Sequence, residues 1–75
     1  MSGYWEFRTP LGAVRIVPRD ERFVVYFEDE ALGSYSSSRQ ALDDLIIGAC
    51  YQPSAGNTAG LGVPDDLDEW TFVRT

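Results

Sequence analysis

The pattern of hydrophobic and polar positions predicts an antiparallel meander of three to four β-strands in the first half of the chain. The expected strands cover residues 4–9, 12–17, 22–28 and 31–36. In the first two segments hydrophobic and polar residues alternate, which is typical of strands that bury one face. The third segment is rich in β-branched and aromatic residues on both faces, which predicts a central strand.

Turn chemistry separates these segments. The sequence TPLG at residues 9–12 has the proline and glycine of a tight turn. Pro18, Arg19 and Asp20 are expected to form the second turn, and the acidic residues 28–30 the third. Gly33, inside the fourth segment, marks either a bulge or a close approach of another group.

A helix is predicted over residues 38–49. Ser37 is a good N-cap, and Gln40 three residues later completes a capping box. The hydrophobic residues of this segment fall on one stripe, wide enough to cover a sheet: Ala41, Leu42, Leu45, Ile46 and Ala49. Ile47 lies on the opposite side. It is either a helix end covered by the following loop or an apolar contact point on an acidic surface.

The last third of the chain changes in composition. Residues 50–63 are rich in glycine and uncharged up to Val63, and such a long loop is either packed by its own side chains or mobile. The sequence VPDDLDEW then favours a short helical turn, because proline and acidic residues suit the start of a helix. Residues 70–73 are either a last strand or a tail. The predicted fold is therefore a single α+β domain over residues 1–75, with one helix packed on the meander.

Composition restricts the chemistry of this domain. The chain has 75 residues, one cysteine and no histidine, which excludes an internal disulfide and argues against a zinc site. We expect no metal and no cofactor. The sequence has no signal-like leader and no apolar run long enough to span a membrane, so we expect a soluble cytoplasmic protein.

The charge is negative and unevenly distributed. The formal net charge is −6, and all six basic residues are arginines. Residues 1–27 hold four arginines and three acidic residues, whereas residues 28–75 hold two arginines and nine acidic residues. Because the overall field repels polyanions, nucleic acid and anionic lipid are disfavoured as partners.

No motif in the sequence predicts catalysis. The glycines of residues 50–63 lack the Lys-Ser/Thr ending of a phosphate-binding loop. The carboxylates of residues 28–30 and 65–69 lack the ligand spacing of a calcium loop. Cys50 has no histidine to activate it, and it follows a helix C-terminus, where the dipole disfavours a thiolate. We therefore expect no enzymatic activity and no catalytic residue.

The sheet face that the helix leaves uncovered is the most informative surface. By alternation it carries Tyr4, Glu6, Arg8, Arg15, Val17, Arg22, Val24 and Tyr26. Either the segment after the helix folds across this face, with Trp70 and Phe72 as its cover, or the face is an interface, since tyrosine and arginine are enriched in binding hot spots. The candidate interaction residues are Tyr4, Arg8, Arg15, Arg22, Tyr26 and Ile47.

Two resemblances extend this reading. The stretch FVVYFEDEALGSYSSSRQALDDL is similar in plan to the three-strand-plus-helix DNA-binding domains of the AP2 and integrase-arm type, which implies DNA recognition by the sheet, with Arg8, Arg15 and Arg22 in that role. The combination LGSY, QALDDL, PSAG and VPDDLDEW resembles a group of short bacterial proteins without an assigned function, and implies no active site.

The functional expectation is a small acidic, non-catalytic interaction or regulatory module. Its partner is expected to be another protein or a second copy of the chain, since small domains often gain stability by association. The alternative is a nucleic-acid-binding module that uses the arginines and tyrosines of the open sheet face.

Overall fold

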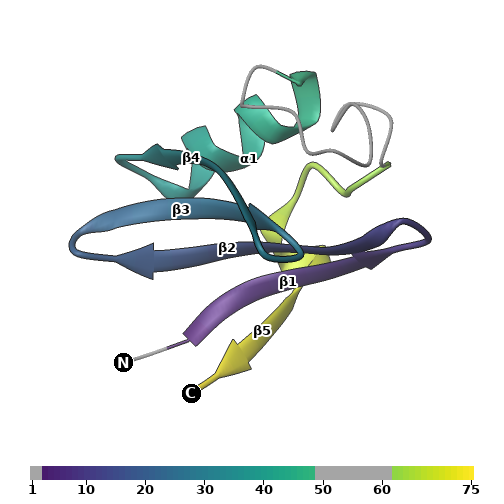
Figure 1. Ribbon diagram of the computed structural model, residues 1–75, viewed down its shortest axis with the longest axis horizontal. Coiled ribbons are helices and arrows are strands. Elements are labelled where there is room, and N and C mark those ends of the chain that lie inside the picture. The colour runs from purple at the N-terminus through teal and green to yellow at the C-terminus, as the bar shows by residue number, and fades with distance from the viewer. Residues whose placement is uncertain (1–2, 49–61) are drawn as a thin grey trace.

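A computed structural model describes residues 3–48 and 62–75 and shows a five-stranded antiparallel sheet with one helix on one of its faces (Figure 1). The elements are β1 (Gly3–Thr9), β2 (Gly12–Arg19), β3 (Arg22–Phe27), β4 (Glu30–Tyr35), α1 (Ser38–Ile47), the 3-10 turn η2 (Leu67–Glu69) and β5 (Thr71–Arg74). The strand order is β4-β3-β2-β1-β5. The predicted α+β class, with a meander packed on a helix, is confirmed.

The second turn lies later in the chain than the sequence suggested. Strand β2 continues through Pro18, which is opposite Phe23, and the turn consists of Asp20 and Glu21. Both turn residues have positive φ, 50° and 65°, as the two-residue turn of a tight hairpin requires. Pro18 precedes Arg19, which pairs with Arg22 to close this turn. At the position of Pro18 a backbone N–H would point away from β3, so its absence costs no hydrogen bond between β2 and β3. The expected turn at Pro18–Asp20 is therefore wrong.

The third turn and strand β4 also follow local backbone chemistry. The turn is formed by Glu28, with φ of 53°, and Asp29, so Glu30 already belongs to β4. Register in β4 shifts between its pairs with Val25 and Tyr26, next to Gly33. The extra residue of this bulge is Leu32, which is buried in the core. The bulge expected near Gly33 is thus present.

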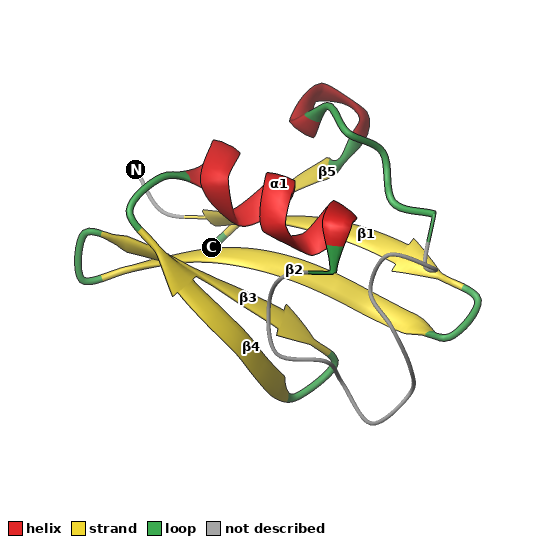
Figure 2. Cartoon of the chain, turned by 90° about the horizontal axis from the view of Figure 1, so that it is seen from above, coloured by secondary structure: helices red, strands yellow, loops and turns green. Residues whose placement is uncertain are grey.

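Helix α1 crosses one face of the sheet and packs on β2, β3 and β4 (Figure 2). It begins at the predicted cap, where the Ser37 hydroxyl accepts a hydrogen bond of 3.1 Å from the Gln40 backbone N–H. The Gln40 side-chain oxygen accepts from the Ser36 hydroxyl at 3.1 Å rather than from the Ser37 backbone N–H, so the predicted N-cap is present but the second bond of the capping box is replaced. The helix ends at Gly48, whose φ of 76° is the left-handed conformation that glycine adopts readily. Its buried residues are Ala41, Leu42 and Leu45.

The C-terminal segment extends the sheet instead of crossing it. Strand β5 pairs with β1, so that Phe72 is opposite Trp5. Trp70, 6% exposed, joins the core beside Phe7, at 5.8 Å between ring centroids, and its indole N–H donates to the Pro64 carbonyl at 3.1 Å. Cover of the outer sheet face by Trp70 and Phe72 was one expectation, and this arrangement contradicts it, because both side chains lie on the helix side.

The core lies between α1 and the sheet. It consists of Val14, Ile16, Val25, Phe27, Leu32, Ala41, Leu42, Leu45 and Trp70. No helix within the described ranges 3–48 and 62–75 is long and apolar enough to cross a membrane.

Candidate functional site: the outer face of the sheet

The face of the sheet that points away from α1 is covered by no element of the described residues, and we call it the outer face. Strand alternation and register assign its members: Tyr4, Glu6, Arg8, Ala13, Arg15, Val17, Arg19, Arg22, Val24, Tyr26, Ala31, Ser34, Thr71 and Val73. All five strands contribute to it. The face is therefore a continuous surface rather than the exposed side of a single hairpin.

An apolar row crosses the outer face from β5 to β3, between the Arg15–Glu6 pair and the β2–β3 turn. Tyr4 is paired with Val73 on one side of the sheet, and Val17 is paired with Val24 on the other. Strands β1 and β2 are antiparallel and pair Trp5 with Ile16. Tyr4 and Val17, one residue further along each strand, therefore lie opposite each other. All four row residues are half-buried by their neighbours. The row joins three aliphatic side chains and one aromatic side chain on a face that faces solvent.

A salt bridge lies beside this row. The Arg15 guanidinium donates from Nε to the Glu6 carboxylate at 2.9 Å, and the Glu6 side chain is only 13% exposed. The hydrogen bond that Arg15 donates to Glu6 raises the pKa of Arg15 above its ordinary value, against the opposing effect of burial. Arg15 also donates to the carbonyl of Glu28 at 3.4 Å. Arg15 and Glu6 therefore largely compensate each other at the centre of the face.

Two other arginines are held by neutral groups. Arg19 donates from Nη1 to the Tyr26 hydroxyl at 3.0 Å. Arg22 donates to the Ser34 hydroxyl at 2.7 Å and to the Ser34 carbonyl at 2.9 Å. The hydrogen-bond partners of these two guanidiniums are thus neutral, and the nearest acidic residues along the chain are Asp20 and Glu21 of the turn that joins Arg19 to Arg22. Arg8 adds a further charge, 80% exposed and 3.8 Å from Glu6.

A shallow hollow of about 270 Å³ opens between these groups. It is lined by Arg15, Val17, Arg19, Tyr26, Glu28 and Asp29. One side offers guanidinium and phenol donors, and the far rim carries two acidic residues. The hollow thus combines an apolar floor with donors for a negatively charged group.

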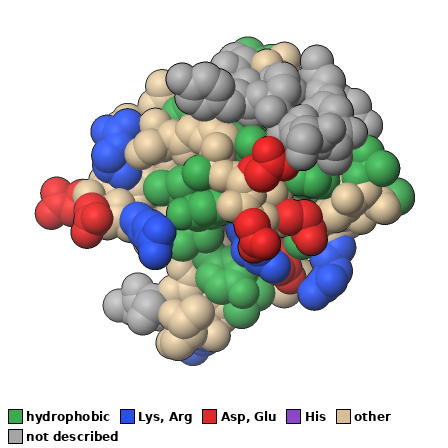
Figure 3. Space-filling model, viewed as in Figure 1, with side chains coloured by type: hydrophobic (Ala, Val, Ile, Leu, Met, Phe, Trp, Pro, Cys, Tyr) green, Lys and Arg blue, Asp and Glu red, His purple; other side chains and the backbone are tan. Residues whose placement is uncertain are grey.

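The outer face differs in charge from the rest of the molecule. It holds four arginines and one glutamate, a net charge of +3, whereas the remaining two arginines and eleven acidic residues carry −9. Figure 3 shows hydrophobic side chains in the middle of the visible face, with basic side chains on both sides of them and acidic ones at one end and beside the centre. Part of this negative charge lies at the ends of the outer face, because Glu28 and Asp29 line its hollow and Asp20 and Glu21 form the turn between Arg19 and Arg22.

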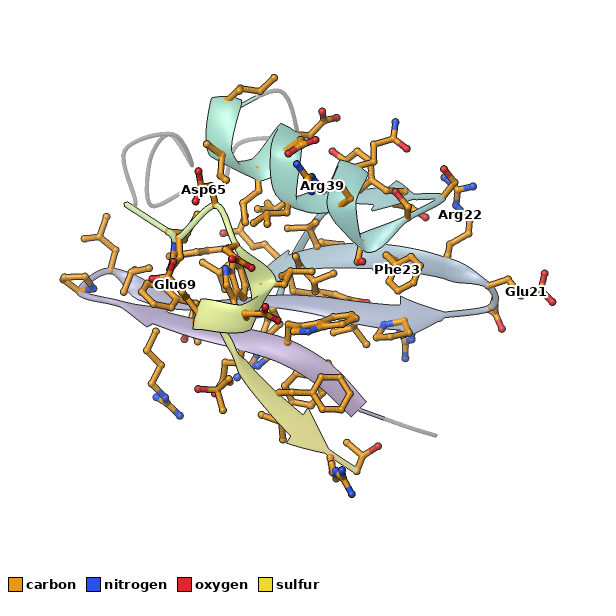
Figure 4. All side chains as sticks on the ribbon, turned by 180° about the vertical axis from the view of Figure 1, so that it is seen from behind. Glu21, Arg22, Phe23, Arg39, Asp65 and Glu69 are labelled. Carbon is orange, nitrogen blue, oxygen red and sulfur yellow. The ribbon has the colours of Figure 1, made fainter. Side chains whose placement is uncertain are left out.

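A second hollow, of about 410 Å³, lies on the helix side. It is lined by Ser38, Arg39, Leu42, Asp65, Asp66 and Leu67. Figure 4 shows Arg39 on α1 and Asp65 on the C-terminal segment, with Glu69 on η2 below them. Arg39 is paired with Asp43 at 3.8 Å, and the acidic residues opposite belong to the start of η2. Every buried polar side-chain atom of the described residues has a partner, so none is left aimed at a ligand here.

The structure brings together five of the six predicted interaction residues. Tyr4, Arg8, Arg15, Arg22 and Tyr26 all belong to the outer face. Ile47, 70% exposed, is on α1 and therefore on the other side of the sheet. It cannot share one contact surface with the other five.

Among the members of this surface that sequence reasoning did not assign to it, Arg19 and Val73 matter most for the site. Arg19 was assigned to a turn, although it continues the alternation of β2. Val73 was not placed, because the sequence does not say which edge of the sheet the last strand joins. The alternation Arg15, Val17, Arg19 was the available signal for the first of these.

The other chemical candidates do not form a site among the described residues. The Glu28 carboxylate accepts a hydrogen bond from the Ala13 backbone N–H at 2.6 Å. This bond lies where the pairing of β2 with β3 ends, so the carboxylate has a structural role there. Asp66 caps η2 through the Asp68 N–H. No group of three or more potential metal ligands is found within residues 3–48 and 62–75. Cys50, most of the loop 50–63, and Ala49 of the predicted helical stripe lie outside the described residues.

Comparison with known proteins adds no assignment. No protein-family model matches the chain, and neither a curated protein nor a solved structure does.

Proposed function

We propose that this chain is a small non-catalytic interaction module that binds a protein partner through the outer face of its sheet. The observation that carries the proposal is the apolar row of Tyr4, Val17, Val24 and Val73 on an uncovered sheet face. The solvated face of an antiparallel sheet is ordinarily polar. Contiguous apolar residues rimmed by polar ones mark interaction sites on soluble proteins.

The polar groups around the row support binding rather than catalysis. Tyrosine and arginine dominate the rim, and these residue types are enriched in protein interfaces. Glu6, the one carboxylate among the strand residues of this face, is already bonded to Arg15 at 2.9 Å, and Glu28 at the rim of the hollow accepts the Ala13 N–H at 2.6 Å. A general base would need a carboxylate that is available to the substrate.

Affinity capture with two matched variants tests this proposal. The tagged chain, Val24→Asp and Ile47→Asp are each used to capture partners from a lysate of the source cell. Both variants add one carboxylate to a surface, but on opposite sides of the sheet. We expect a protein that co-purifies with wild type and Ile47→Asp and is lost with Val24→Asp.

The opposite pattern has a clear meaning. A partner lost with Ile47→Asp and kept with Val24→Asp would move the interface to α1. If no captured protein distinguishes Val24→Asp from wild type, the outer face is not a binding surface. Circular dichroism spectra of both variants must match wild type, so that loss of binding is not loss of fold.

A further inference from the structure

We infer that the partner of the outer face is an acidic segment of another protein, in which carboxylates accompany aliphatic side chains. The inference rests on the proposed function and specifies the chemistry of the ligand. Its basis is the net charge of +3 on the strand residues of the outer face, which is bounded by the acidic turns at residues 20–21 and 28–29 in a chain of net charge −6. Complementary potentials across an interface set specificity and speed association.

The positions of Arg19 and Arg22 locate the acidic groups of the ligand. Both guanidiniums are held by neutral partners, Tyr26 and Ser34, at 2.7–3.0 Å. These hydrogen bonds therefore bring no negative charge to either guanidinium. They also restrict the conformations of both side chains before a ligand binds. A carboxylate accepts two parallel hydrogen bonds from a guanidinium, and these are stronger than the bonds to neutral hydroxyl and carbonyl groups.

The hollow lined by Arg15, Val17, Arg19 and Tyr26 is suited to the anchoring side chain. At about 270 Å³ it offers room for a carboxylate beside Arg19 and for methylene groups over Val17. Its far rim, Glu28 and Asp29, repels a second acid placed there. The ligand is therefore expected to have its acidic groups on the Arg19 side and its aliphatic groups along the apolar row.

A second copy of the chain fits this face less well. A two-fold symmetric dimer through the outer face brings each patch against its own equivalent. Two surfaces of charge +3 then oppose each other, and like charges across an interface cost affinity. Contact between the outer face of one copy and the acidic residues of another is not two-fold symmetric, so it would build rings or open chains instead of a dimer.

Nucleic acid also fits this face less well. The net charge of +3 on the strand residues of the face corresponds to about three phosphate contacts, which is few for a nucleic-acid interface. Tyr4 and Tyr26 are half-buried in the sheet, so they offer only part of each ring for base stacking. The aliphatic row has no counterpart in a phosphate backbone.

Selection from displayed random peptides tests the inference without knowledge of the natural partner. Peptides of roughly ten residues span about 33 Å when extended, which matches the 32 Å longest extent of the domain. Selected peptides are synthesised with a fluorescent label, and their affinities for the full chain are measured by anisotropy at about 50 and 200 mM salt. A labelled oligothymidine is measured in parallel.

The expected result has three parts. Selected peptides are enriched in Asp or Glu together with Val, Ile, Leu or Tyr. Their affinity falls at least about ten-fold with Arg19→Glu or Arg22→Glu and is regained in part when the acids of the peptide are changed to lysine. Arg39→Glu, a matched charge reversal on α1, leaves the affinity unchanged.

Other outcomes overturn the inference in distinguishable ways. Neutral or basic peptides that are lost with Val24→Asp would refute the acidic ligand and leave the proposed function standing. Peptides that are insensitive to Val24→Asp would refute both. Oligothymidine binding that is lost with Arg22→Glu would replace the protein partner by nucleic acid. A dimer in light scattering that Val24→Asp dissociates would make a second copy the occupant.

Discussion

Two adjacent valines of β3 test directly whether the outer face is open. Val25 is 0% exposed in the core, whereas Val24 points the other way, opposite Val17 and Ser34. Threonine replaces one methyl group of valine by a hydroxyl and keeps the β-branched shape, so Val24→Thr and Val25→Thr retain the same preference for a strand. The difference between their effects on stability therefore reports burial on the two faces.

The magnitudes follow from this burial. Val25→Thr loses one buried methyl group, about 0.8 kcal/mol, and buries a hydroxyl without a partner, about 1–3 kcal/mol. We expect a loss of about 2–4 kcal/mol in the free energy of unfolding. Val24→Thr places its hydroxyl at the solvated face and should change that free energy by less than about 0.5 kcal/mol. A domain of 75 residues is stable by roughly 4–11 kcal/mol in total, so the difference is large.

Urea unfolding provides the assay. Trp5 and Trp70 report the transition by fluorescence, and circular dichroism reports the loss of secondary structure. With a slope of about 1 kcal/mol per molar urea, the midpoint should fall by about 2–4 M for Val25→Thr and by less than about 0.5 M for Val24→Thr. Equal losses in the two variants would show that the outer face is covered by another part of the molecule or by a second copy. The proposed binding surface would then be wrong.

Three further variants test the local structure by the same unfolding assay. Trp70→Phe removes the indole N–H that bonds the Pro64 carbonyl and should cost about 1–2 kcal/mol; no loss would mean that the C-terminal segment is not held by this bond. Ser37→Ala removes the helix cap and should cost about 1 kcal/mol, whereas Ser37→Asp, which can also cap, should restore most of it. Glu21→Gly should stabilise the domain by about 0.5–1 kcal/mol, because glycine adopts the φ of 65° without strain; a loss would argue against this hairpin turn.

The elements that could be predicted from sequence are those with local signals. Period-two alternation in residues 4–9 and 12–17 and the cap at Ser37 depend on neighbouring residues, and the structure has strands and a helix there. The position of β5 depends on which edge of the sheet its backbone pairs with. That choice is made by contacts distant in sequence, such as the packing of Trp70 on Phe7, and alternation does not encode it.

The candidate site was predictable for a related reason. Alternation alone assigns Tyr4, Arg15 and Tyr26 to the face without the helix, because their neighbours in sequence form the core. Ile47 was grouped with them although the helix must pack on the apolar face, so that its outward side points away from the arginines. Combining the helical stripe with the strand alternation would have separated the two surfaces.

The two kinds of arginine on the outer face carry different consequences for a ligand. Arg15 is compensated by Glu6 at 2.9 Å, so a ligand that approached Arg15 would have to compete with a carboxylate that is already in place. Arg19 and Arg22 are restrained by hydroxyls and a carbonyl, so binding a carboxylate there displaces no charge and orders little that is not already ordered. The centre of the face therefore favours apolar contact, and the end near Arg19 and Arg22 favours acidic contact. An acidic ligand should accordingly bind in one orientation along the sheet, and reversing the order of its acidic and aliphatic halves should weaken it as strongly as Arg22→Glu does.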